Sequence, residues 1–434
     1  MSRKKLGFWT SSSLVVGNMI GSGIFLLPAT LASFGSISIL GWIISAFGAA
    51  ALAYVFIEFS KMIPGTSGGP YVYSRSGLGD FAGFLVAWGY WISIWCVNAA
   101  IAIALVSYLG VFFPVLQVNN VLAICTGLAI VWGVVWVNTL GIREAGIFSL
   151  VTSILKITPL LAIGIFGLFY LEVEHFSSFN ISGQTDIRAI TQTATLTFFA
   201  YMGIECATIP SGDIENPKRI IPRSTYFGLG VVTVIYILGT TSLMGIIPPE
   251  ELKYSQAPFA DAASIIWGPW AENLVAIGAI ISTLGALNGW ILIQGQIPAA
   301  ISRDKLFPSI FSKENKNGVP ALSIVLSSIL ISLLMIMNYA KGLVAAFKFA
   351  ILLSSMTALI AYLFTSVSYV MVTAKNEGLT SGFKRKVAIA SVSFFFSIWA
   401  IAGSGLEIVY WGFFLLMGGL PVYVWMKVKN ENLN

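Results

Sequence analysis

The residues GNMIGSGIFLLP at positions 17–28 interrupt an apolar run with three glycines and a proline. A second apolar run, FFAYMGIECATIP at positions 198–210, is interrupted in the same way. Both stretches place a proline seven residues after a glycine, Gly21 in the first and Gly203 in the second. Breaking a helix inside a membrane frees backbone N–H and C=O groups that lipid cannot satisfy. The two stretches therefore predict broken helices whose freed backbone faces a cavity or other protein groups.

The composition of the whole chain indicates a membrane location for these runs. Of 434 residues, 57% are hydrophobic and 10% are charged, whereas a soluble globular protein has about 25% charged residues. A soluble enzyme and a disordered chain are therefore excluded. The single histidine, His175, stands in a polar loop, and the three cysteines stand singly in apolar runs, so the sequence offers no metal-ligand or nucleophile pattern. We expect no enzymatic activity, no cofactor, no metal and no nucleic-acid partner.

Twelve apolar runs are long enough to cross a bilayer core as helices, which takes about 20 residues each. We therefore expect an all-α integral membrane protein, with residues 1–434 forming a single membrane transport domain. The runs lie near 11–32, 37–60, 81–113, 120–138, 149–172, 192–212, 224–247, 273–299, 321–338, 345–373, 385–404 and 406–427.

The two interrupted runs are the first and the sixth, which makes them counterparts in two groups of five. Interrupted segments at matching positions of two halves are typical of secondary transporters, with the substrate site at the repeat interface. We predict two matching groups of five helices, helices 1–5 over about 11–172 and helices 6–10 over about 192–373, followed by two extra helices over about 385–427. Close packing of small residues is the alternative explanation of the glycines.

The freed backbone groups suggest a substrate. N–H groups at the N-terminus of a half-helix suit a carboxylate, and freed C=O groups suit an ammonium. Together they suit the backbone of an α-amino acid. An open channel and a membrane-embedded enzyme are rival classes, but paired breaks build a site that can close, and one loop histidine supplies no catalytic constellation.

The basic residues are distributed unevenly around the runs. If the N-terminus is cytoplasmic, 19 Lys and Arg residues lie in segments on that side, and only Arg188, Lys253 and Lys341 lie in loops on the other. Cytoplasmic loops carry the excess of Lys and Arg in membrane proteins. We therefore expect a bacterial-type inner-membrane protein with both termini in the cytoplasm, and we attribute the net charge of +6 to topology.

Two charged residues inside the predicted spans are candidates for a role in transport. Glu205 follows the break of the sixth span, where it can act in gating or accept hydrogen bonds from freed backbone N–H groups as a structural residue. Lys156 lies about 10 Å into the fifth span, with no polar stripe leading to water. Desolvation lowers the pKa of a lysine, so Lys156 is a candidate for ion coupling. Lys348, near the outer end of the tenth span, is expected to extend to the interface.

The two interrupted stretches resemble the corresponding spans of the amino acid–polyamine–organocation (APC) superfamily of transporters. The eighth span is similar to that of the basic amino acid and polyamine antiporters of the arginine/agmatine type. The similarity covers nearly the whole chain, about residues 6–425. It is carried by residues 17–25, 198–205, 215–222, 285–290 and 294–296.

The resemblance implies an all-α, LeuT-like fold with an inverted five-plus-five repeat and two extra helices. It also implies a substrate site and a set of gates. The implied substrate-binding residues are Met19, Gly21, Ser22, Gly23, Ser93, Ile94, Asn98, Phe199, Met202, Glu205, Trp290 and Ser354. The implied gating residues are Phe199 at the outer gate, Trp290 at the middle gate, and Tyr90, Glu205 and Tyr362 at the cytoplasmic gate.

Some positions depart from the antiporter pattern. Phe199 stands where the antiporters have a tryptophan, and a phenyl ring is a poorer cation–π partner than indole, which puts a guanidinium preference in doubt. Ser93 and Ile94 also differ in type from the arginine exchanger. Lys156 is instead similar to the fifth-span lysine of proton-coupled permeases and heteromeric exchangers, where a fixed cation replaces a bound sodium ion.

The sequence therefore leaves two mechanisms open. One is exchange of an amino acid for a related amino acid or its decarboxylation product, and the other is proton-coupled amino-acid uptake using Lys156. The expected partners are small amino acid or amine substrates and the lipid bilayer. Dimers occur in the family, so a homodimer is left open.

Overall fold

We analysed a computed structural model, which describes residues 7–63, 69–141, 157–176, 179–208, 214–338, 342–378 and 381–431. Lys156, the candidate for ion coupling, and Pro210, the proline of the second break, lie outside the described residues.

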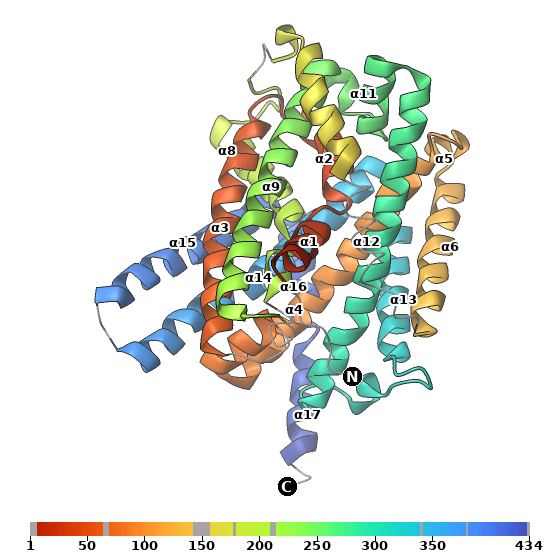
Figure 1. Cartoon of the computed structure of the whole chain (residues 1–434). Helices are drawn as coiled ribbons and strands as arrows, with labels where there is room; N and C mark the ends of the chain where they lie inside the picture. Colours follow the sequence, from red (N-terminus) through yellow and green to blue (C-terminus); the bar gives the residue numbers. More distant parts are fainter. Residues whose placement is uncertain are drawn as a thin grey trace.

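Every regular element in the described ranges is helical (Figure 1). The α-helices are α1 (Phe8–Met19), α2 (Gly23–Ala32), α3 (Ser38–Met62), α4 (Pro70–Leu109), α5 (Val115–Val118), α6 (Asn120–Thr139), α8 (Asp186–Phe198), α9 (Pro217–Ile246), α10 (Pro249–Leu252), α11 (Pro258–Trp267), α12 (Pro269–Arg303), α13 (Ala321–Asn338), α14 (Leu343–Glu377), α15 (Ser381–Gly403), α16 (Leu406–Met417) and α17 (Leu420–Glu431). Short 3₁₀ helices are η1 (Gly167–Tyr170), η2 (Val173–Phe176), η3 (Phe199–Tyr201), η4 (Ile204–Ala207) and η6 (Ser309–Ser312).

Nine spans in the described part of the chain are long and apolar enough to cross a membrane, and the bent pair α1–α2 makes a tenth. The two remaining predicted runs give shorter helices. The run at 149–172 is described as a helix only over Ile157–Tyr170, and the run at 192–212 divides into α8, η3 and η4 because it is broken. An all-helical membrane protein is confirmed, whereas the count of twelve spans stays a prediction.

Helix α4 is the central element of the bundle. It packs against α14, α12, α13, α6 and α16, and 94% of its most apolar window is buried. Figure 1 shows α1 and α4 near the middle of the bundle and α15 extending from its left side. At Gly79 the backbone of α4 leaves the helical conformation (φ 83°, ψ −177°), so the first residues of α4 form a separate segment.

A polar cluster joins that first segment of α4 to the end of α12. The Arg75 guanidinium lies 2.7 Å from Asp80 and 3.1 Å from Asp304, and the Tyr71 hydroxyl donates to Asp304 at 2.6 Å. Because these charged groups are partly exposed, their pairing stabilises the fold only modestly. Its clear effect is geometric, since it fixes two helix ends to each other.

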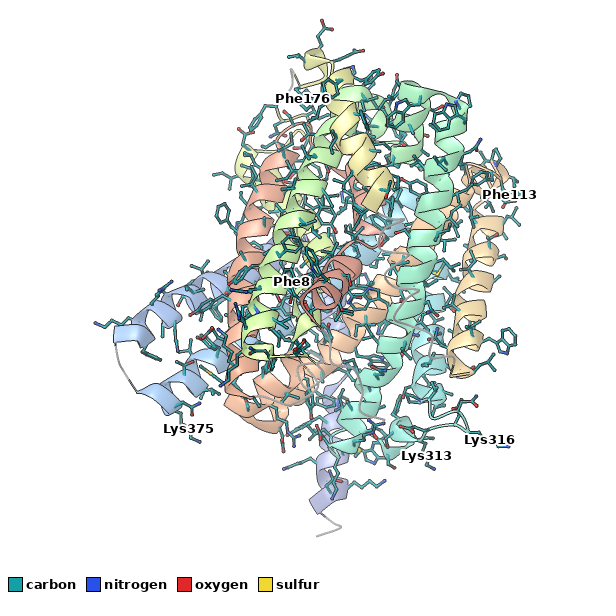
Figure 2. All side chains as sticks on the ribbon, in the orientation of Figure 1. Phe8, Phe113, Phe176, Lys313, Lys316 and Lys375 are labelled. Atoms are coloured by element: carbon teal, nitrogen blue, oxygen red, sulfur yellow. The ribbon has the colours of Figure 1, made fainter. Side chains whose placement is uncertain are left out.

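The segments predicted to lie on opposite sides of the membrane are at opposite ends of the bundle. In Figure 2, Lys313, Lys316 and Lys375 lie toward the lower end, and Phe113 and Phe176 lie toward the upper end. The three lysines belong to the segments expected inside. The structure thus separates the two sets, and which end faces the cytoplasm stays a prediction.

Candidate functional site

The first predicted break lies between α1 and α2. Helix α1 ends at Met19, and Ile20 leaves the helical conformation (φ −76°, ψ 83°). The N–H group of Gly21 donates to the Met19 carbonyl at 2.9 Å, which is a tight local turn in place of a helical bond. Helix α2 begins at Gly23 with a bend of 40° from α1. The break expected from the glycines is therefore confirmed.

The second break follows α8. The chain passes through η3 to Met202, which is extended (φ −62°, ψ 137°). Gly203 then adopts a left-handed conformation (φ 103°, ψ 0°) before η4 begins at Ile204. A residue with a side chain rarely adopts this conformation, and glycine does so without steric cost. The sequence placed this break correctly because the requirement is local.

The two breaks lie against each other. A Cβ atom on Gly203 would lie 3.3 Å from the Cβ of Asn18, and one on Gly23 would lie 3.2 Å from the Cβ of Ala200. Each break thus contains a glycine that lets the other backbone approach. Segments about 180 residues apart in the sequence meet at the two positions where their helices are interrupted.

A small cavity lies beside this crossing. Its volume is about 20 Å³, room for about one water molecule, so an amino acid requires the site to expand. The buried Ser22 hydroxyl has no hydrogen-bond partner among the described residues, which leaves it available to a ligand. The lining residues are Asn18, Met19, Gly21, Ser22, Gly23, Val97, Ile101, Phe199, Met202 and Trp290, of which seven were predicted to bind substrate.

Glu205 and four other predicted substrate-binding residues are buried but are not among those lining the cavity. The Ser354 hydroxyl donates to the Ser93 carbonyl at 2.9 Å, and the Ser93 hydroxyl donates to a carbonyl of its own helix. Ile94 is fully buried in α4. The Asn98 side-chain N–H donates to Gln294 at 2.7 Å. In this conformation these four residues contact protein groups beside the cavity.

In the predicted cytoplasmic gate, the side chains of Tyr90 and Tyr362 lie at the carboxylate of Glu205. Glu205, in η4, is fully buried, and the Tyr90 hydroxyl of α4 donates to its Oε1 at 2.5 Å. The Tyr362 hydroxyl of α14 and the backbone N–H groups of Gly203 and Glu205 also interact with this carboxylate. The three residues predicted for the cytoplasmic gate therefore lie together, and the gating and the structural interpretation of Glu205 both stay predictions.

The aromatic residues predicted to close over substrate are also in place. Phe199 packs edge-on against Phe347 of α14 with ring centroids 6.3 Å apart. Trp290 of α12 is 3% exposed and lines the cavity. The roles assigned to both residues stay predictions, and the structure places both rings at the cavity.

Sequence reasoning missed several residues at the site. Asn18, Val97 and Ile101 line the cavity. Val97 and Ile101 continue the face of α4 that carries Tyr90 and Ile94, at the three- and four-residue spacing of a helix, so this spacing could have identified them. Tyr236 of α9, whose hydroxyl contacts both breaks, was missed as well. The sequence offered no local signal for it.

Two broken helices that meet beside a small cavity inside an all-helical membrane bundle are typical of transporters with a LeuT-like fold. The fold is similar to that of MhsT in complex with L-phenylalanine, with a TM-score of 0.59, 16% identity, and coverage of 93% of this chain and 99% of MhsT. It is also similar to a substrate-bound, outward-open Na⁺-coupled sialic acid symporter, with a TM-score of 0.56, 12% identity, and coverage of 94% and 93%.

The chain belongs to the amino acid permease family of the APC superfamily, whose profile matches residues 6–424. It is 36% identical to the cadaverine/lysine antiporter of Escherichia coli over 79% of this chain and 77% of that protein. It is 30% identical to the arginine/ornithine antiporter of Pseudomonas aeruginosa and to the arginine/agmatine antiporter of Chlamydia pneumoniae, each over 99% of this chain and 92% of the relative. The family expected from the sequence is confirmed, and it is a family of membrane transporters.

Proposed function

We propose that this chain exchanges a basic amino acid for a related amino acid or for the amine formed by its decarboxylation, by alternating access across the inner membrane. The observation that carries the proposal is the contact between the two helix breaks beside one cavity. The antiporters named above, which pair lysine with cadaverine and arginine with ornithine or agmatine, support this substrate class.

Backbone groups at the breaks supply the recognition of the amino acid. The N-terminus of α2 presents the amides of Gly23 and its neighbours, together with the Ser22 hydroxyl, to a carboxylate. Carbonyl groups freed near Met19 and Met202 suit the ammonium group. The substrate side chain then lies between Trp290 and Phe199, whose ring faces attract a cation.

Closure of the site is assigned to two groups of side chains. Tyr90 and Tyr362 close the cytoplasmic end through Glu205, and Phe199 closes the opposite end beside Phe347. The cavity of about 20 Å³ is too small for an amino acid, so the site expands when substrate binds. Exchange requires the two ends to open alternately, with substrate bound during each change.

The proposal includes the finer topology predicted from the sequence. It comprises twelve spans, an inverted five-plus-five repeat with two additional helices, and both termini in the cytoplasm. A homodimer is compatible with this arrangement, and its test is the mass of the purified protein in detergent.

The experiment is uptake of labelled lysine, arginine, ornithine and leucine into proteoliposomes. Each substrate is tested with and without internal substrate, and with and without an inward proton gradient. We expect basic amino acids to enter only vesicles preloaded with a basic amino acid or amine. Uptake into empty vesicles that follows the proton gradient would overturn exchange. In that case Lys156→Ala should abolish the uptake, because the alternative mechanism assigns the coupling to that ammonium.

A further inference from the structure

Tyr236 lies in the middle of α9 and is fully buried. Its ring packs between Trp42 of α3 and Tyr201 of η3, with centroid distances of 4.8 Å and 5.8 Å. These aromatic contacts leave the ring little freedom, so the position of its hydroxyl is fixed by the surrounding helices.

The Tyr236 hydroxyl contacts both helix breaks. It donates to the Met19 carbonyl at 2.7 Å and lies 3.1 Å from the Ala200 carbonyl. In continuous helices these carbonyls would accept from the amides of Gly23 and Ile204, four residues later. The breaks displace both amides, and one phenolic hydrogen is shared between the two carbonyls.

The two hydrogen bonds of the Tyr236 hydroxyl therefore connect the end of α1 to η3 through one side chain. The backbones of the two breaks also approach closely at Asn18 with Gly203 and at Gly23 with Ala200. Such contacts limit how close the breaks can come, but they hold them together only weakly. A directional bond to both carbonyls is what limits their separation.

We infer that Tyr236 is a positioning residue whose hydroxyl sets the separation of the two breaks, and thereby favours substrates that engage both of them. This inference rests on the proposed function. An amino acid presents a carboxylate to the N-terminus of α2 and an ammonium to freed carbonyls of the breaks, so its affinity depends on how the breaks are held. The amine formed by its decarboxylation lacks the carboxylate and does not span them.

The test variant is Tyr236→Phe, which keeps the ring and removes the hydroxyl. The matched control is Tyr369→Phe, because Tyr369 is also fully buried and packs against Phe59 and Tyr54, in α14 and outside the cavity lining. The first measurement is amide hydrogen exchange without substrate, in peptides covering residues 17–25 and 199–208. Loss of a hydrogen bond predicts about fivefold faster exchange in both peptides, and no change in either with the control.

The second measurement is the dissociation constant of lysine and cadaverine, and of arginine and agmatine, from thermal shift in detergent. For Tyr236→Phe we expect about fivefold weaker binding of the amino acids and less than twofold weaker binding of the amines. A structural defect alone would weaken amino acids and amines equally, and that result would overturn the inference. Unchanged exchange in either peptide would overturn it too.

The two measurements keep this inference distinct from the proposed function. If wild-type protein binds none of the four compounds, the proposed substrate class is wrong. The hydrogen-exchange result then still decides whether the Tyr236 hydroxyl joins the breaks, because it requires no ligand.

Discussion

Replacing Tyr90 by phenylalanine tests how firmly the proposed cytoplasmic gate is closed. The substitution removes the 2.5 Å hydrogen bond to Glu205, which is fully buried. A hydrogen bond to a charged group contributes about 1.5–3 kcal/mol, and about 2 kcal/mol corresponds to a thirtyfold change in an equilibrium. We therefore expect the equilibrium for local opening around Glu205 to rise about thirtyfold.

Hydrogen exchange of the peptide covering residues 199–208 measures that opening, because its amides exchange only when the segment opens. The matched control is Tyr108→Phe, in the same helix, whose hydroxyl donates to the Phe25 carbonyl at 3.0 Å, away from Glu205. We expect the control to leave the 199–208 peptide unchanged.

A double-mutant cycle with Glu205→Gln identifies the partner of Tyr90. If the two residues act through one hydrogen bond, the double variant should open little more easily than the more affected single variant. Two results would refute the hydrogen bond between Tyr90 and Glu205 as the contact that closes this segment. One is that the effects of the two single substitutions on opening simply add. The other is that Tyr90→Phe accelerates hydrogen exchange of the 199–208 peptide less than threefold.

Three further changes test separate parts of the structure. Gly203→Ala forces a side chain into a left-handed conformation against Asn18. The strain should cost about 1–3 kcal/mol of stability and lower the melting temperature. The control Gly230→Ala has open space around the added methyl group and should leave the melting temperature unchanged. Trp290→Leu removes the ring face at the cavity and should weaken binding of basic amino acids roughly tenfold. The control Trp270→Leu, on the exposed surface of the same helix, should leave the affinity unchanged in the same binding assay. Burial raises the pKa of Asp261 in α11, so the native protein keeps this proton to higher pH than the unfolded chain does. The associated stability is complete below about pH 4 and is lost as pH rises through the raised pKa. Asp261→Asn should therefore flatten the dependence of melting temperature on pH above about pH 4, and an unchanged profile would contradict this assignment.

The breaks were predictable from the sequence because their cause is local. Glycine and proline inside an apolar run identify the interruption directly, and Gly203 adopts the left-handed conformation that only glycine takes easily. The grouping of Tyr90 with Glu205 and Tyr362 was available only from the resemblance, since no spacing in the sequence connects residues so far apart.

Other features could not be predicted because they depend on how helices cross. The hydroxyl of Tyr236 meets two carbonyls that lie 217 and 36 residues away along the chain. Similarly, the side-chain N–H of Asn98, a residue predicted to bind substrate, donates to Gln294 of α12. In a contracted site, a polar side chain that awaits a ligand bonds to its protein neighbours, and a sequence motif does not distinguish the two situations.

The deep burial of α4 has a consequence for how the protein is assembled. Helix α4 is apolar enough to enter the bilayer on its own, yet its main contacts come from α12 and α14, which are synthesised about 160 to 300 residues later. Until α12 arrives, the side-chain amide of Asn98 lacks its partner Gln294 and is costly in lipid. The nascent chain therefore has a long interval in which a chaperone or the insertion machinery must shield one face of α4. Mutations in α12 and α14 that slow the packing of these helices around α4 are expected to impair biogenesis before they impair transport.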